Sequence, residues 1–137
     1  MEALRRALGV LENGQVLGIF PEGKRSFDCR MQKPELGIAF IALRSGAPVI
    51  PVGISGSEAF EHFGAIFKRP KVTVTIGQPF SFSKGEGKLT REQLTQSADQ
   101  IMERIAELLP KEYRGVYGES NGIKGNTGVV SGSKVGI

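Results

Sequence analysis

The sequence contains one cysteine, one histidine and no long apolar run, and each shortage excludes a class of protein. The single thiol, Cys29, excludes a disulfide within the chain and favours a reducing compartment. No nearby histidine could activate it, so we expect no catalytic role for it. No stretch approaches the roughly 20 apolar residues of a membrane-spanning helix, and residues 1–6 lack the apolar run of a signal peptide. We therefore expect a cytoplasmic protein, or one that lies peripherally on a membrane, unless a segment outside this sequence anchors it.

The composition is that of one soluble globular domain. The chain has 137 residues, of which 39% are hydrophobic and 23% are charged. Its net charge of +4 has two interpretations: a solvated basic surface, which is the default, or attraction to anionic lipid head groups and phosphorylated ligands. No G-x-x-x-x-G-K-S/T run occurs, which disfavours nucleotide binding. We expect no cofactor, no metal and no nucleic-acid partner.

Three helices are predicted from apolar period and end signals. Residues 2–12 repeat apolar side chains at helical spacing, and Asn13-Gly14 supplies the stop. Residues 36–44 form a mostly apolar helix that begins after Pro34-Glu35 and ends at Gly46. The third helix follows a capping box that starts at Thr90 and has an apolar face as far as Pro110.

Three strands are predicted beside these helices. Residues 15–20 form a short apolar run, and residues 47–54 form a longer one typical of a buried parallel strand. Pro51 would then lie at a bulge or an unpaired edge. Together with the helix between them, these runs predict a right-handed βαβ unit. Residues 71–76 alternate as a half-buried strand, and residues 57–63 suggest a short helix.

The predicted fold class is therefore α/β, with a βαβ unit, a third strand and a C-terminal amphipathic helix. Residues 1–114 form the domain. Residues 115–137 are rich in Gly, Ser and Asn without an apolar face, so we expect a disordered tail.

The charged run at residues 20–26 contains the chemistry of a phosphate site. A phosphate monoester has about −1.5 to −2 charges at neutral pH, and Arg25 offers a guanidinium that can bond two of its oxygens. Gly23 lets the backbone N–H groups approach, and Ser26 can donate a hydroxyl. Glu22 would orient Arg25 or Lys33, or accept from a glycerol hydroxyl. The alternative is a solvated charged turn.

The run Phe-Pro-Glu-Gly-Lys-Arg-Ser resembles the F-P-E-G-T-R-S block of the glycerophosphate acyltransferases, the 1-acyl-sn-glycerol-3-phosphate (lysophosphatidate) acyltransferase family. The flanks over about residues 3–80 are similar as well, including Lys33, Gly37 and the apolar block at residues 47–52. The resemblance implies a partial glycerophosphate-acyltransferase domain. It also implies acyl transfer from a thioester carrier to lysophosphatidate, which yields phosphatidate.

The resemblance assigns the acceptor's glycerol phosphate to Glu22, Gly23 and Arg25. Lys24 replaces the family's usual Thr, and it would either add a second cation to the phosphate site or point to water. The implied partners are lysophosphatidate, an acyl donor on acyl carrier protein or coenzyme A, and the inner face of a membrane.

The family's catalytic His-x-x-x-x-Asp pair has no counterpart here. His62 is followed five positions later by Phe67, and neither Asp28 nor Asp99 has a His five positions before it. We predict no catalytic residue in this chain and little turnover from it alone. It is either the C-terminal portion of an acyltransferase or a short protein that binds lipid phosphate or forms half of a split enzyme.

Overall fold

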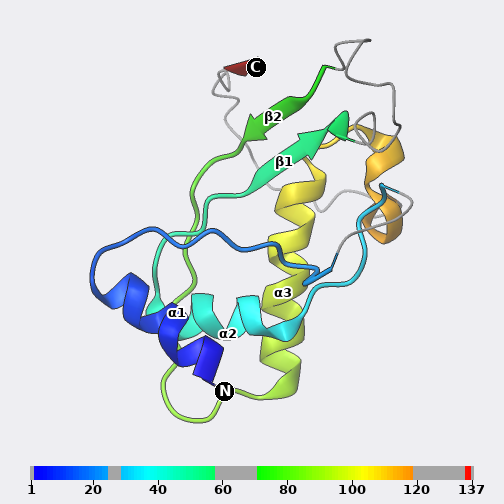
Figure 1. Cartoon of the computed structure of the whole chain (residues 1–137). Helices are drawn as coiled ribbons and strands as arrows, with labels where there is room; N and C mark the ends of the chain where they lie inside the picture. The colour runs from blue at the N-terminus through cyan, green and yellow to red at the C-terminus, as the bar shows by residue number, and fades with distance from the viewer. Residues whose placement is uncertain (1, 25–28, 58–70, 119–134, 137) are drawn as a thin grey trace.

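A computed structural model of the chain describes residues 2–24, 29–57, 71–118 and 135–136. Two helices precede a pair of strands, the longest helix follows them, and the small sheet lies near one end of that helix (Figure 1). The elements in chain order are α1 (Glu2–Glu12), α2 (Leu36–Ser45), β1 (Val52–Ser55), β2 (Thr73–Ile76), α3 (Arg91–Ala106), the short helices η3 (Lys111–Tyr113) and η4 (Gly115–Tyr117), and β3 (Val135–Gly136).

The three predicted helices are confirmed, and their ends follow the expected chemistry. Gly46 follows α2 with a φ of 64°, and its N–H donates to the carbonyl oxygen of Ala42. Thr90 precedes α3 and accepts from the N–H of Gln93, whose side chain accepts in return from the N–H of Thr90. This reciprocal capping box satisfies donors that a helix start leaves unpaired.

The core lies along α3. Ala98, Ile101, Met102 and Ala106 are buried on one face of the helix, which contacts α2 and β1. Ala39, Ile41 and Ala42 are the buried residues of α2. The long helix therefore joins the helical part of the domain to the sheet.

The predicted βαβ unit is wrong. β1 pairs with β2 in antiparallel register, Val52 opposite Ile76, and β2 pairs with β3 in the same sense. Residues 15–20 form no strand, and no strand in the described part of the chain pairs with them. A strand needs a neighbour for its backbone groups. Because β1 finds that neighbour in the later alternating segment, which is the predicted third strand, the sheet is antiparallel.

One face of this sheet carries apolar side chains that are partly exposed. Gly53 lies against Leu108 and Leu109, which follow α3, so its neighbours Val52 and Ile54 point to the opposite side. Val52 and Ile54 are 40% and 44% exposed, and Ile76, opposite Val52, is 53% exposed. We call Val52, Ile54 and Ile76 the open sheet face.

Two further predictions fall largely outside the described residues. Only Ser57 of the predicted helix at 57–63 is described. Of the predicted tail, residues 115–118 and 135–136 are described, and they contribute η4 and β3. The division at residue 114 therefore stays a prediction.

Candidate functional site

The charged run begins a loop whose two ends are joined. We call residues 20–35 the charged loop. The N–H of Gly23 donates to the carbonyl oxygen of Phe20 at 3.1 Å, which closes a turn. The N–H of Glu35 donates to the carbonyl oxygen of Pro21 at 2.8 Å. Because Glu35 directly precedes α2, this bond sets the beginning of the loop beside the N-terminus of that helix.

Gly23 occupies a position that a larger residue fits badly. Its φ is +65°, in the left-handed region that favours glycine. A Cβ placed on Gly23 would lie 3.0 Å from Cγ of Glu35. The turn and the loop closure both depend on this residue.

The structure describes four of the six predicted site residues. Glu22 is half-buried, whereas Gly23, Lys24 and Lys33 are exposed. Arg25 and Ser26 lie outside the described residues. Lys24 and Lys33 flank that gap within the charged loop, so both described cations of the prediction belong to one loop.

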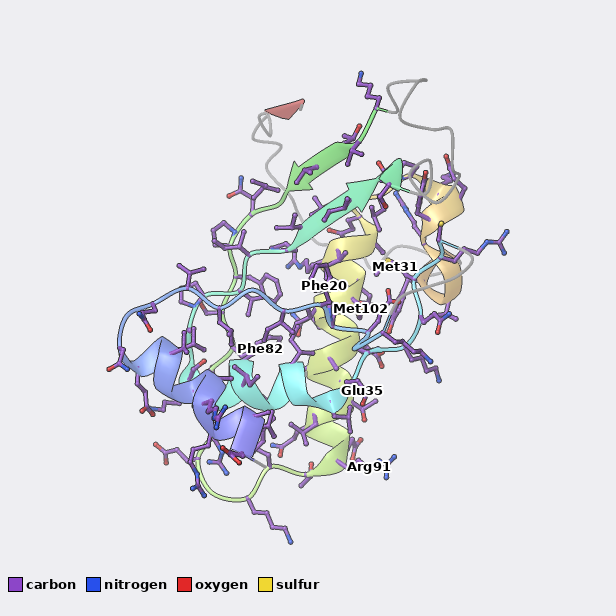
Figure 2. All side chains as sticks on the ribbon, in the orientation of Figure 1. Phe20, Met31, Glu35, Phe82, Arg91 and Met102 are labelled. Atoms are coloured by element: carbon purple, nitrogen blue, oxygen red, sulfur yellow. The ribbon has the colours of Figure 1, made fainter. Side chains whose placement is uncertain are left out.

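The far end of the charged loop is anchored in the core by Met31. This side chain is 6% exposed and packs with Met102, Ala106 and Leu109. Figure 2 labels Met31 and Met102 at α3, and Figure 1 shows the chain around Met31 beside the short helices that follow α3. The N–H of Met31 donates to the carbonyl oxygen of Tyr113 at 2.8 Å. The loop is thus held by side-chain burial and by the backbone.

Two tyrosines that the sequence interpretation did not assign to the site lie at this anchor. Tyr113 and Tyr117 are partly buried and pack against the Met31 cluster. The hydroxyl of Tyr117 donates to Oδ1 of Asp99 at 2.8 Å. Two features of the sequence could have pointed to this contact. Asp99 is a polar residue next to Ala98, which is buried, and both tyrosines of the chain follow Pro110 within seven residues.

The surroundings of Tyr117 hold its hydroxyl in the neutral form. Burial raises the pKa of Tyr117 well above its usual range, and the hydrogen bond to Asp99 and the charge of that carboxylate raise it further. Glu103 and Glu22 contribute in the same direction.

Two other kinds of functional feature, a metal-binding group and a membrane-spanning helix, are absent from the described residues. Among them no group of three or more His, Cys, Asp or Glu side chains is arranged to hold a metal ion. No helix in the described part of the chain has the length and apolarity to cross a membrane. His62 lies outside these residues.

Comparison with known proteins identifies relatives of the chain. A family model described as Acyltransferase matches residues 1–55. A 1-acyl-sn-glycerol-3-phosphate acyltransferase of Bacillus subtilis is 27% identical over 107 residues, which are 77% of this chain and 51% of that protein. The enzyme of the same name from Pseudomonas aeruginosa is 30% identical over 105 residues, 76% of this chain and 40% of that protein.

A plant protein extends this set. The chloroplastic 1-acyl-sn-glycerol-3-phosphate acyltransferase BAT2 of Brassica napus is 31% identical over 88 residues, which are 63% of this chain and 26% of that protein. No solved structure matches the chain with significance. The chain spans about half the length of the Bacillus subtilis relative and less of the others. The matched block at residues 1–55 includes the charged loop, and the family model and these relatives all show similarity of this chain to the 1-acyl-sn-glycerol-3-phosphate acyltransferases.

Proposed function

We propose that the chain supplies the acceptor-binding part of an acyltransferase that converts 1-acyl-glycerol-3-phosphate to phosphatidate. The observation that supports this most directly is the joined loop, in which the N–H of Glu35 bonds the carbonyl oxygen of Pro21. This bond holds the start of the loop beside the N-terminus of α2, and Lys24 and Lys33 belong to the same loop; Arg25 follows Lys24 in the sequence. Cations and the positive end of a helix dipole both favour a phosphate monoester.

Each predicted side chain has a role in this proposal. Arg25 bonds two phosphate oxygens, and Lys24 and Lys33 add positive charge around them. Ser26 donates one hydrogen bond. Glu22 orients a cation or accepts from a glycerol hydroxyl, while Gly23 permits the close approach of backbone donors.

The reaction itself requires a base. The free hydroxyl oxygen of the acceptor attacks the thioester carbonyl, a C–O bond forms, the C–S bond breaks, and the hydroxyl proton leaves. A positioned base is worth about 10²- to 10⁴-fold in rate. The 137-residue sequence has no His-x-x-x-x-Asp, so we propose that the chain alone turns over little or not at all.

A second candidate is half of a split enzyme, or a non-catalytic unit that binds lipid phosphate. The open sheet face favours the first form, because the exposed apolar side chains Val52, Ile54 and Ile76 are grouped on one side of the sheet. In either form we propose attachment at the cytoplasmic, inner face of a membrane. The acyl donor is a thioester of acyl carrier protein or coenzyme A.

Binding of the acceptor tests the proposal directly. A short-chain lysophosphatidate below its micelle concentration is titrated into the wild-type chain, into Arg25→Ala and into the control Arg91→Ala, an exposed cation on α3. Arg25→Ala should weaken binding by roughly 1.5–3 kcal/mol, the value of a charge-assisted hydrogen bond, and Arg91→Ala should change nothing. Equal affinity for lysophosphatidate in all three chains would refute the proposal and leave the alternative interpretation, that the loop is a solvated charged turn.

Catalysis is tested separately. The purified wild-type chain is given acyl carrier protein and coenzyme A thioesters together with lysophosphatidate, and phosphatidate is measured. A clear rate from this chain alone would refute the argument from the missing base.

A further inference from the structure

The segment that follows α3 contacts the charged loop at two backbone positions. We call η3, η4 and the residue between them, residues 111–117, the tyrosine turn. Its Tyr113 carbonyl oxygen accepts from the N–H of Met31 at 2.8 Å. Two residues later, a Cβ placed on Gly115 would lie 2.1 Å from the carbonyl oxygen of Met31. The turn and the loop therefore meet backbone to backbone, and at Gly115 only glycine leaves room for the contact.

The same turn is fixed from two other sides. The hydroxyl of Tyr117 donates to Asp99 on α3 at 2.8 Å, and the side chain of Arg114 donates through Nε to the carbonyl oxygen of Leu109 at 3.0 Å. The hydroxyl oxygen of Tyr113 accepts from the N–H of Gly56, directly after β1, at 3.3 Å. These bonds hold the tyrosine turn against α3 and the sheet, so the turn can support the charged loop where the two meet at Met31.

The charged loop rests on this support close to its predicted phosphate-binding residues. Met31 lies two positions before Lys33. The beginning of the loop is bonded to Glu35, whose N–H donates to the carbonyl oxygen of Pro21 at 2.8 Å, and Glu35 lies four positions after Met31. Met31 thus links the later part of the charged loop to residues 111–117, and the bond between Pro21 and Glu35 joins that part to the beginning of the loop.

We propose that the tyrosine turn positions the charged loop for its acceptor, with Tyr113 and Tyr117 as positioning residues and Gly115 as the point of contact. The proposal rests on the proposed function for its ligand, but the mechanical link between turn and loop does not depend on it. The turn itself touches no phosphate. It restricts the conformations of the unbound loop, so the loop loses less conformational entropy when it binds the acceptor. Affinity therefore rises without a new contact.

The sequence pattern alone gives this segment no role, because it follows Pro110 and begins the Gly-rich stretch. Its role depends on contacts between residues that are distant in the chain. Met31 and Tyr113 meet only in the folded domain. A truncation at the predicted domain boundary, residue 114, would remove Gly115 and Tyr117 together with the C-terminal stretch.

Amide hydrogen exchange tests the mechanical link without any ligand. Gly115→Ala places a methyl group against the Met31 carbonyl at a φ of +51°, whereas Gly87→Ala has a similar φ of +69° and nothing within 4 Å of the added Cβ. The two variants share the left-handed strain, and only the first disturbs the contact. We expect Gly115→Ala to accelerate exchange at the amides of Met31, Gly23 and Glu35 by several-fold, with the amides of α3 unchanged.

A second set of three variants covers the case in which Gly115→Ala does not fold. Tyr117→Phe and Asp99→Ala each remove the hydrogen bond between the turn and α3, whereas Asp99→Asn keeps an oxygen that can accept it. Tyr117→Phe and Asp99→Ala should both accelerate exchange at Met31 and Glu35, and Asp99→Asn should restore rates near the wild type. A change in global stability alone would alter exchange throughout the domain. It would not produce a difference between Asp99→Ala and Asp99→Asn that is confined to the amides of Met31 and Glu35.

Titration with short-chain lysophosphatidate completes the experiment. A lost positioning hydrogen bond should weaken affinity by about two- to tenfold in Tyr117→Phe, with a comparable loss in Gly115→Ala and none in Gly87→Ala. Faster exchange together with weaker binding supports the proposal. Unchanged exchange at Gly23 and Glu35 in both Gly115→Ala and Tyr117→Phe overturns it. A variant whose loop amides exchange faster but which binds lysophosphatidate with wild-type affinity overturns it as well. A wild-type chain that binds no lysophosphatidate refutes the proposed function, while the exchange result still decides whether the turn holds the loop.

Discussion

The N–H of Glu35 donates to the carbonyl oxygen of Pro21 at 2.8 Å, so the residue that precedes α2 is bonded to the second residue of the charged loop. This bond holds the start of the helix and the start of the loop together. Because α2 packs on α3, a change in the packing of these helices reaches the loop without touching any of its charged side chains.

Replacement of Gly23 by alanine should impair both the fold and the loop. The left-handed backbone costs about 1 kcal/mol or more for a residue with a Cβ, and the new methyl group would crowd Cγ of Glu35. Urea unfolding and lysophosphatidate titration measure the two effects. Gly14→Ala is the matched control, since Gly14 has a φ of +71° and nothing within 4 Å. Equal losses in both variants would mean that strain alone, without the Glu35 contact, explains the result.

Loss of the capping hydroxyl in Thr90→Ala should destabilise the domain by about 1 kcal/mol. The hydroxyl oxygen accepts from the N–H of Gln93 at 3.2 Å, and no other side chain of the capping box can take its place. Chemical denaturation of this variant is compared with Thr95→Ala, whose exposed hydroxyl donates to a helix carbonyl at Arg91. Thr95→Ala should be neutral or slightly stabilising, because alanine is the better helix former. If Thr90→Ala were equally neutral, the box would contribute nothing to stability.

Truncation of Met102 should cost roughly 2–5 kcal/mol, the usual range for a large apolar side chain removed from a core. Met102 is fully buried and belongs to the cluster that anchors Met31. We therefore expect Met102→Ala to lower the unfolding free energy and also to weaken lysophosphatidate binding. Met102→Leu conserves volume and should cost less than about 1.5 kcal/mol. A destabilised Met102→Ala chain with unchanged affinity would show that the anchor does not influence the loop.

Stability should fall in alkaline solution because of Tyr117. Its pKa in the folded chain lies above the ordinary value of 10.0, so the folded state retains the phenol proton where the unfolded state has lost it. The contribution is therefore complete below pH 10 and declines as the pH rises above that value. Unfolding free energies measured from pH 8 to pH 11 should fall more steeply for the wild type than for Tyr117→Phe. Parallel curves would exclude a perturbed phenol at this position.

The helices could be predicted from the sequence because their signals are local. The apolar period of residues 2–12, the stop at Gly46 and the box at Thr90 each act within a few residues. Strand pairing is not local. Residues 15–20 have an apolar composition suited to a strand, yet Val16 and Phe20 are 94% and 81% exposed, and β1 pairs with β2 instead. Composition indicates that a segment can extend, whereas its partner is decided elsewhere in the chain.

The candidate site was predictable to a similar extent. The charges of the loop and the need for glycine at Gly23 follow from residues that are adjacent in sequence, and the φ of +65° at Gly23 fits that expectation. Its phosphate role remains a prediction, and Arg25 and Ser26 lie outside the described residues. The tyrosine turn was missed because Met31 and Tyr113 are brought together only by the packing of α3.

The open sheet face changes how mutational data on this protein should be interpreted. A polar replacement at Ile54 or Ile76 costs the isolated chain little, since both side chains already meet water. Purified variants such as Ile54→Ser should therefore unfold and bind much like the wild type. If the same variants fail in the cell, that loss cannot come from the fold of this chain. The difference between the two settings would reveal a neighbour that no single-chain experiment can detect.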